Sequence, residues 1–415
     1  GVWLTLSLVG GTLAVGLLAG LYPAMYLSRF RPATMLRNAA GAGGGSFRRG
    51  LVVGQFAISI ALIAGTFVVV RQLDYLETKD LGFDPEQVVV LPTGDTSIRT
   101  RFDAFKQAVL SHPSVVDAAG SSAIPGQGTM AFGIVPEGIS QDQTWTAWSL
   151  RVDDDNLLDT YGVDLVSGRY FSDDLVCDSS AIVINKSLVD ALGWTDPVGK
   201  RLDVVGEVNG GVVVGVVEDF HYESLYHAID PLVLFLSPRG QNLSVRVNDV
   251  ADALSHLEKT WKAFEPRYPF EYYFVDESFA AQYEAERRLS TTIAIFAALA
   301  VLIACLGLLG LASFTAEQRR KEIGVRKVLG ATAAQIVLLL SQDFIRLVAI
   351  AFVIGAPLAF IAMTRWLGAF AYKVPVGPGV FIIAGLAAAI VALAAIGSQS
   401  ARAAFANPTR SLRNE

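Results

Sequence analysis

The chain has 415 residues, of which 52% are hydrophobic and 17% charged, and its formal net charge is −6. This length allows two or three domains, and the hydrophobic content favours a membrane protein over a soluble one. The two cysteines, Cys177 and Cys305, lie in regions of opposite character, one polar and one apolar, so a disulfide framework is excluded.

Five uncharged stretches are long enough to cross a bilayer core of about 30 Å, which takes roughly 20 apolar residues. They are residues 2–27, 51–70, 293–313, 347–364 and 374–398. We therefore expect five transmembrane helices. The fourth contains Pro357 and follows Asp343 and Arg346, whose charges we place near the water boundary.

The first and the last apolar stretches are followed by similar sequences. P-A-T-M-L-R-N at 32–38 corresponds to P-T-R-S-L-R-N at 408–414. From this repeat we infer that residues 1–38 are the last helix and cytoplasmic tail of a preceding, similar module. Residues 39–50 contain G-A-G-G-G-S, a flexible composition, and are expected to be a cytoplasmic linker.

Lys and Arg in the short loops predict the orientation, because basic loops stay in the cytoplasm. They are concentrated in 28–50, 316–333 and 399–415, so 72–289 and the short loop at 367–377 lie outside. The predicted order is a transmembrane helix at 51–71, an outer domain at 72–289, a helix at 290–315, a charged cytoplasmic segment at 316–333, a helix with a cytoplasmic lead-in at 334–366, an outer loop at 367–377, a helix at 378–398 and a cytoplasmic tail at 399–415.

The outer domain alternates strand-like and helix-like runs, which is an α+β pattern. Strands are expected at 88–92, 149–152, 181–185, 212–217, 232–236 and 243–247, and helices at 100–111, 186–192, 249–264 and 276–289. The last strand, the helix from 250 to 264 and F-E-Y-Y-F-V at 270–275 predict a β-α-β unit. The fold class is an α-helical transmembrane bundle with a large α+β domain inserted after the second predicted helix.

Catalytic and metal-binding motifs are weak. The four histidines lack the spacing of metal ligands. V-E-D-F-H at 217–221 offers Asp219 and His221 without a nucleophile, so we expect it to end a strand and begin a turn. G-W-T-D-P-V-G-K-R at 193–201 lacks the spacing of a phosphate-binding loop and has Arg201 where Ser or Thr is needed. We expect no catalytic residue, metal or cofactor in this chain.

The charged segment E-Q-R-R-K-E-I-G-V-R-K-V-L-G-A-T at 317–332 predicts a helix with a defined end. Glu317 with Lys321, and Glu322 with Arg326, are favourable i,i+4 pairs. Gly330 is placed to end this helix, and Thr332 with Gln335 fits a capping box that opens the next one. The segment is either an anchor on anionic lipid or a contact for a protein partner, and its mixed charge favours the partner.

K-E-I-G-V-R-K-V-L-G-A-T at 321–332 closely resembles the signature of FtsX-like (MacB-like) ABC transporter permeases. Each motif is weak alone, but their order over essentially the whole chain is specific. The further motifs that resemble this family are R-R-G-L-V-V-G-Q-F-A-I-S-I-A-L-I at 48–63, D-L-G-F at 80–83, S-G-R-Y-F at 167–171, I-V-I-N at 182–185, D-P-V-G-K at 196–200, V-G-V-V-E-D-F-H at 214–221, D-P-L-V at 230–233 and W-L-G-A-F-A-Y at 366–372.

The resemblance implies a permease of the bacterial inner membrane with a MacB-like periplasmic core domain. The repeat suggests that this chain is the C-terminal module of a tandem pair. A partner ABC ATPase dimer would bind ATP and Mg²⁺, and its closure would move the periplasmic domain through the membrane helices, a process called mechanotransmission. The implied ATPase contact consists of Glu317, Arg319, Arg320, Lys321, Glu322, Ile323, Gly324, Arg326, Lys327 and Gly330.

The implied activity is export or extraction of a substrate from the periplasm or membrane, as in efflux. A periplasmic adaptor or substrate protein is a further expected partner, and nucleic acid is not. The alternative is an FtsX-like regulator whose outer domain activates a periplasmic cell-wall hydrolase. A secondary transporter is less favoured, because such a protein places ionisable residues or broken helices at the membrane midplane, and only the region from Asp343 to Pro357 comes near that description.

Overall fold

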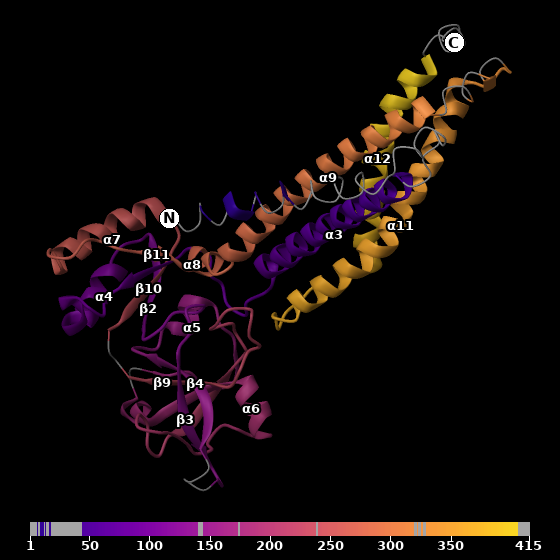
Figure 1. The fold of residues 1–415 in the computed structure, drawn as a ribbon. Helices are drawn as coiled ribbons and strands as arrows, with labels where there is room; N and C mark the ends of the chain where they lie inside the picture. The colour runs from indigo at the N-terminus through magenta and orange to yellow at the C-terminus, as the bar shows by residue number, and fades with distance from the viewer. Residues whose placement is uncertain are drawn as a thin grey trace. The chain divides into compact units, whose positions relative to one another are not determined.

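The computed structural model describes residues 44–139, 144–172, 175–237, 240–318 and 329–405, together with residues 6, 9–11, 13, 16–17, 322 and 325–326 (Figure 1). The predicted helix at 2–27 is described only at isolated positions, and both copies of the repeated ending lie outside the described residues. The chain divides into two compact units. The first comprises Gly1–Ile60, Leu299–Gly355 and Gly385–Glu415, and the second comprises Ala61–Ala298 and Ala356–Ala384.

Four long helices carry the apolar stretches. They are α3 (Gly44–Thr78), α9 (Glu284–Gln318), α11 (Ala333–Leu367) and α12 (Pro378–Phe405). Among the described residues, four segments are long and apolar enough to span a membrane: Arg49–Thr78, Glu284–Thr315, Ser341–Leu367 and Pro378–Gly397. This confirms the apolar helices predicted from residue 51 onward. Helix α3 continues past residue 70 into R-Q-L-D-Y-L-E-T, and α9 begins in E-A-E-R-R-L-S-T-T, because these two charged flanks contain no Gly or Pro that would end a helix.

Small residues let these helices approach one another inside the first unit. A Cβ atom on Gly355 of α11 would lie 3.0 Å from the Cα atom of Ala57 in α3. A Cβ atom on Gly385 of α12 would lie 2.6 Å from the ring of Phe352. Close backbone approach through small residues is the usual way in which helices pack in a membrane, where burial of apolar surface supplies no driving force.

The segment between α3 and α9 forms the α+β domain that the sequence predicts. Its strands are β1 (Val88–Pro92), β2 (Val115–Ser121), β3 (Met130–Pro136), β4 (Trp145–Val152), β5 (Leu165–Gly168), β6 (Ala181–Asn185), β7 (Leu202–Val204), β8 (Val212–Val217), β9 (Leu232–Leu236), β10 (Asn242–Val247) and β11 (Tyr273–Phe274). Its helices are α4 (Phe102–Leu110), α5 (Leu157–Tyr161), α6 (Lys186–Leu192), α7 (Val250–Phe264) and α8 (Val275–Ala281), with 3-10 turns at η1 (Ser97–Arg101) and η2 (Val176–Ser180).

The strands form one mixed sheet in the order β11-β1-β10-β2-β4-β9-β6-β8-β5, with β3 between β4 and β7. The sheet has two parts. We call the first four strands the β1 half and the strands from β4 onward, with β3 and β7, the β4 half. The halves join at a single residue pair, Ser121 with Val152. Two backbone hydrogen bonds of 2.9 Å flank it, from Ser122 to Arg151 and from Asp153 to Gly120.

The predicted β-α-β unit is present with one strand inserted into it. The unit consists of β10, α7 and β11, and β1 pairs antiparallel with both strands, so that it lies between them. The predicted helix at 276–289 is wrong as a single element. Residues 282–283 separate α8 from α9, and the second of these, Tyr283, is buried in the core.

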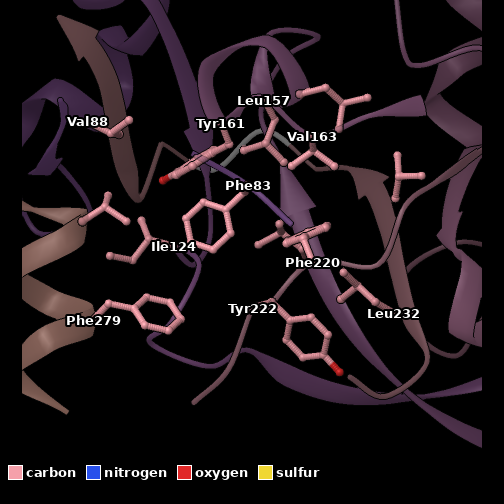
Figure 2. Packing of buried hydrophobic residues seen from close by; sticks show 14 of the residues in the cluster. Phe83, Val88, Ile124, Leu157, Tyr161, Val163, Phe220, Tyr222, Leu232 and Phe279 are labelled. Atoms are coloured by element: carbon pink, nitrogen blue, oxygen red, sulfur yellow. The ribbon is translucent and has the colours of Figure 1, made fainter. Parts of the chain in front are cut away.

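Among the described residues, three hydrophobic clusters hold the domain together. One packs α4 and α7 on a face of the β1 half, around Phe105 and Trp261. The second packs α6 on the β4 half. The third and largest contains residues of both halves, such as Tyr161 and Phe220, together with Phe83 and with Val69, Leu73 and Leu76 of α3. Figure 2 shows the ring of Phe83 at the centre of this cluster, with its centroid 5.9 Å from those of Tyr161 and Phe279.

Candidate functional site

The charged segment predicted to contact an ATPase is described at part of its length. The Arg326 guanidinium lies 2.8 Å from the Glu322 carboxylate, and about half of each side chain is exposed. This confirms the predicted i,i+4 pair. Glu317 belongs to the last turn of α9, which ends at Gln318. The other proposed contact residues except Gly330 lie outside the described residues, namely Arg319, Arg320, Lys321, Ile323, Gly324 and Lys327.

The end of this charged helix is the one that the sequence predicts. Gly330 has a φ of +96°, and the Ala331 N–H donates a hydrogen bond of 2.9 Å to the Arg326 carbonyl. This is the long hydrogen bond of a glycine-terminated helix. Thr332 and Gln335 then exchange backbone-to-side-chain hydrogen bonds of 3.0 and 3.3 Å, which confirms the capping box.

Apolar side chains on the same helix face solvent. Val325 is 54% exposed and Leu329 is 80% exposed. They are four residues apart, so they lie on one face of the helix. Charged and apolar side chains are therefore both available to a protein partner at this turn of the chain.

A second candidate site lies wholly in the second unit, where the loop between α11 and α12 contacts the outer domain and the end of α3. We call it the loop junction and define it by Gln72, Lys79, His221, Tyr226, Glu286, Phe370, Tyr372 and Val374. Gln72 is fully buried. Its amide donates a hydrogen bond of 2.8 Å to the Tyr372 carbonyl and accepts one of 2.9 Å from the Val374 N–H. One side chain of α3 thus satisfies two backbone groups of the loop.

The Tyr372 ring is held by two side chains of the second unit. It meets the His221 imidazole edge to face, with centroids 4.9 Å apart, and the Lys79 ammonium lies 4.4 Å from its centroid. Such a cation–π contact contributes about 0.5–2 kcal/mol. Burial, with Lys79 as the second cause, lowers the pKa of His221 to about 4. His221 is therefore neutral near pH 7 and acts in packing.

Tyr226 holds the other side of the loop. Its ring stacks on Phe370 with centroids 4.5 Å apart, and its carbonyl accepts a hydrogen bond of 3.1 Å from the Ala371 N–H. Its hydroxyl donates to the carboxylate of Glu286 in α9. Burial raises the pKa of Tyr226, so the hydroxyl stays protonated and remains a donor. Tyr226 therefore connects the loop to the first turn of α9.

The turn that presents His221 and Tyr226 is fixed by Asp219. Its carboxylate accepts hydrogen bonds from the Asn185 amide at 2.8 Å and from the Ser187 N–H and hydroxyl at 2.9 and 2.7 Å. The Asn185 amide oxygen in turn accepts from the Leu232 N–H at 2.8 Å. A Cβ atom on Gly82 would overlap with the Asp219 carbonyl, so only glycine fits there.

These contacts bring several short sequence motifs together and give them structural roles. D-L-G-F, I-V-I-N, V-E-D-F-H and D-P-L-V meet around Asp219, and W-L-G-A-F-A-Y packs on them through Phe370 and Tyr372. V-E-D-F-H ends β8 and begins a turn, as predicted from the sequence. D-P-V-G-K forms a turn in which the Gly199 N–H donates to the Val213 carbonyl at 2.7 Å and the Lys200 ammonium lies over the Trp194 ring.

Sequence reasoning did not identify the loop junction as a site. The motifs around His221 and Tyr372 were visible, but they lie 151 residues apart and gave no sign that they touch. Gln72 had a weak signal, because it is the first uncharged polar residue after the apolar stretch at 51–70. Among the residues that the structure describes, no group of three His, Cys, Asp or Glu side chains could hold a metal ion.

Comparison with known proteins identifies two family models. The MacB-like periplasmic core domain matches residues 50–256, and the FtsX-like permease C-terminal model matches residues 294–408. A solved structure of the periplasmic region of MacB from Actinobacillus actinomycetemcomitans is similar, with 14% identity, a TM-score of 0.35 and coverage of 48% of this chain and 94% of that chain. The extracellular domain of the noncanonic ABC-type transporter YknZ from Gram-positive bacteria is similar with 13% identity, a TM-score of 0.32 and coverage of 45% and 98%. Comparison with curated protein sequences finds no match.

Proposed function

Since the chain belongs to the FtsX-like ABC transporter permeases that carry a MacB-like periplasmic core domain, we propose that it couples ATP hydrolysis on a partner chain to movement of that domain. The permease would lie in the bacterial inner membrane. The segment from Glu317 to Gly330 would contact an ABC ATPase dimer, which would bind ATP and Mg²⁺. The work of the permease would be export or extraction of a substrate from the periplasm or membrane, by mechanotransmission.

The loop junction is the observation that supports this mechanism. Tyr372 and Phe370 lie on the connection between two membrane helices, and both rings pack on the turn between β8 and β9. A displacement of this connection must either move that turn or break the two ring contacts. Because packed contacts resist both separation and overlap, they transmit displacement better than a flexible linker does.

Hydrogen–deuterium exchange on the intact permease with its copurified ATPase, in nanodiscs, tests the proposal. In the wild-type complex we expect ATP to change the exchange rates of residues 218–231. Tyr372→Ala removes the contacts with His221 and Lys79, so it should abolish this change while ATP hydrolysis continues. An ATP-dependent change that persists in Tyr372→Ala would show that the loop junction is not the route. No change in the wild type would contradict mechanotransmission itself.

A matched control is available at the same residue of the loop between α11 and α12. Tyr372→Phe retains the ring and its contacts with His221 and Lys79, and the hydrogen bond to Gln72 uses the backbone carbonyl. We therefore expect Tyr372→Phe to behave like the wild type. Loss of coupling in this variant would assign the effect to the hydroxyl group and contradict the packing argument.

Copurification of the intact protein tests the partners. We expect an ABC ATPase to be retained, and its loss on charge reversal in the segment from Glu317 to Gly330 would support the proposed contact. A cell-wall hydrolase retained as the periplasmic partner would instead favour the regulatory function, in which the same movement activates an enzyme outside the membrane.

A further inference from the structure

The β1 half of the periplasmic domain contains an open cavity of about 530 Å³. This volume lies in the range of small-molecule sites. The wall comes from four separate parts of the chain: the turn after β1, the residue that follows β2, the start of β10, and α7 with the loop that leaves it. None of these parts belongs to the loop junction or to the charged segment.

The cavity wall is fixed by backbone hydrogen bonds. The N–H groups of Thr93 and Gly94 both donate to the Gln241 carbonyl at 2.9 Å, which joins the turn after β1 to the start of β10. The indole N–H of Trp261 donates to the Tyr268 carbonyl at 3.2 Å, which holds the loop after α7. The shape of the cavity therefore exists before any ligand binds.

The charged side chains that line the cavity are acidic. They are Asp95 and Glu271, both exposed, and none of the described lining residues is basic. No hydrogen bond or ion pair of the described structure engages either carboxylate. The neighbouring Glu265 differs, because hydrogen bonds from Ser97 hold its pKa below the usual value, with a smaller contribution from Arg267. Asp95 and Glu271 thus keep their full capacity to accept hydrogen bonds from a ligand.

Aromatic surface lies beside these carboxylates. Tyr268, which is 51% exposed, lines the cavity, and Trp261 reaches the wall with only 2% of its surface exposed. Gln241 and Asn242 add amide groups to the same wall. Carboxylates next to aromatic rings suit a ligand that is positively charged and has an apolar part, since ammonium groups bind both carboxylates and ring faces.

We propose that this cavity binds a small organic cation, an amine attached to an apolar group. The ammonium would donate hydrogen bonds to Asp95 and Glu271, and the apolar part would lie against Tyr268. This site goes beyond the proposed coupling function, because binding requires neither ATP nor the partner ATPase. A periplasmic domain that is moved by ATP hydrolysis would then carry a cation site of its own.

Three probes with one skeleton and different charges test the proposal: phenethylamine, 2-phenylethanol and phenylacetate. Binding to the full chain in nanodiscs is measured by saturation-transfer NMR and calorimetry, without ATP. We expect phenethylamine to bind with an affinity on the order of millimolar, as a ligand of this size allows. We expect the neutral and anionic probes to bind at least about tenfold more weakly. Equal binding of the three probes would overturn the proposal.

Variants then locate the binding. Asp95→Asn with Glu271→Gln removes both charges without changing shape, and it should weaken phenethylamine binding by about tenfold or more. The matched control is Asp103→Asn with Glu277→Gln, which removes two exposed carboxylates that do not line the cavity. This control should bind like the wild type. Unchanged binding in the cavity variant, or an equal loss in the control, would contradict the assignment.

Discussion

At the scale of single residues, Gln72 acts both as a hydrogen-bond donor and as a hydrogen-bond acceptor toward the loop between α11 and α12. Its amide group serves both a carbonyl and an N–H of the loop between α11 and α12. A buried backbone group that loses its partner costs about 1–3 kcal/mol. Gln72 therefore stabilises the loop without any contribution from charge.

Replacing Gln72 with Leu leaves both backbone groups of the loop without a partner. We expect Gln72→Leu to lower the thermal stability of the protein in nanodiscs and to speed hydrogen exchange at the Val374 amide, because that N–H loses its acceptor. Thr66→Val is the control on the same helix, since Thr66 bonds only to the Leu62 carbonyl within α3. An exchange rate at Val374 that is the same in wild type and Gln72→Leu would contradict this role.

His221 predicts a pH dependence with a definite sign. Its pKa is about 4 in the folded protein and 6.5 for an ordinary histidine. Between these values the unfolded chain binds more protons, so the contribution of His221 is fully present above pH 6.5 and is lost as the pH falls toward 4.

Comparison with His221→Phe isolates this effect from other titrating groups. The variant keeps an aromatic ring against Tyr372 and has no proton to gain. We expect the wild type to lose more thermal stability than His221→Phe when the pH falls from 7 to 5. Parallel losses in the two proteins would show that His221 does not titrate in this window.

At the scale of elements, the charged helix before Gly330 is held by its own ion pair and by its cap. The Glu322–Arg326 pair is half exposed, so its contribution to helix stability is only about 0.2–0.5 kcal/mol. Such a pair is too weak to explain a large functional effect by stability alone. A large loss of function on changing this pair would therefore indicate that the pair contacts a partner protein.

Charge reversal tests this helix directly. We expect Glu322→Lys and Arg326→Glu, made separately, to uncouple ATP hydrolysis from the function of the permease, because each places two like charges at i,i+4. The double variant restores an ion pair and should recover coupling. Wild-type activity in both single variants, measured as ATP hydrolysis by the copurified complex together with substrate release, would rule out the proposed role of the pair.

The sequence predicts elements of this domain well where residue type and burial agree. The strands β1, β6, β8 and β9 consist largely of Val, Ile and Leu and were found with their bounds. The strands β2 and β5 were missed, because V-V-D-A-A-G-S and L-V-S-G contain small and polar residues that disfavour strands. Tertiary contacts determine the structure of these two segments. In β5, a Cβ atom on Gly168 would overlap with the Val214 carbonyl, so glycine allows β5 to pair closely with β8.

The candidate sites differ in how far the sequence could reveal them. The Gly330 stop and the Thr332–Gln335 cap use neighbours in the chain, so local spacing was enough. Gln72 and the Tyr372 carbonyl are 300 residues apart, and the four parts that wall the cavity are also separate in sequence. Contacts of this kind depend on the complete fold, and no local pattern encodes them.

At the scale of the whole molecule, the periplasmic domain is an insertion between α3 and α9 whose core includes membrane-helix residues. Val69, Leu73 and Leu76 of α3 share a cluster with Phe83 and Phe220. Within this domain, Asp154 ties α4 of the β1 half to the strand junction. Its carboxylate lies 2.8 Å from the Lys106 ammonium and accepts from the Gly120 N–H at 2.9 Å.

Removing only one partner of this buried pair should be costly. We expect Asp154→Ala to destabilise the protein by about 3–5 kcal/mol, because it leaves the Lys106 ammonium buried without its counter-ion. The double variant Lys106→Met with Asp154→Ala should lose less, since neither charge of the pair remains buried. Thermal unfolding in nanodiscs measures both, and a double variant less stable than Asp154→Ala would contradict this account.

The single pair between Ser121 and Val152 has a mechanical meaning for the domain. In the strand ladder the two halves are joined by this one residue pair and two backbone hydrogen bonds, and the largest hydrophobic cluster packs against both halves. The turn that holds Tyr372 belongs to the β4 half, and most of the cavity wall belongs to the β1 half. Ser122, which lines the cavity, donates one of the two hydrogen bonds that join the halves. We therefore expect a tilt of one half against the other to change the aperture of the cavity, because Ser122 belongs to both the strand junction and the cavity wall.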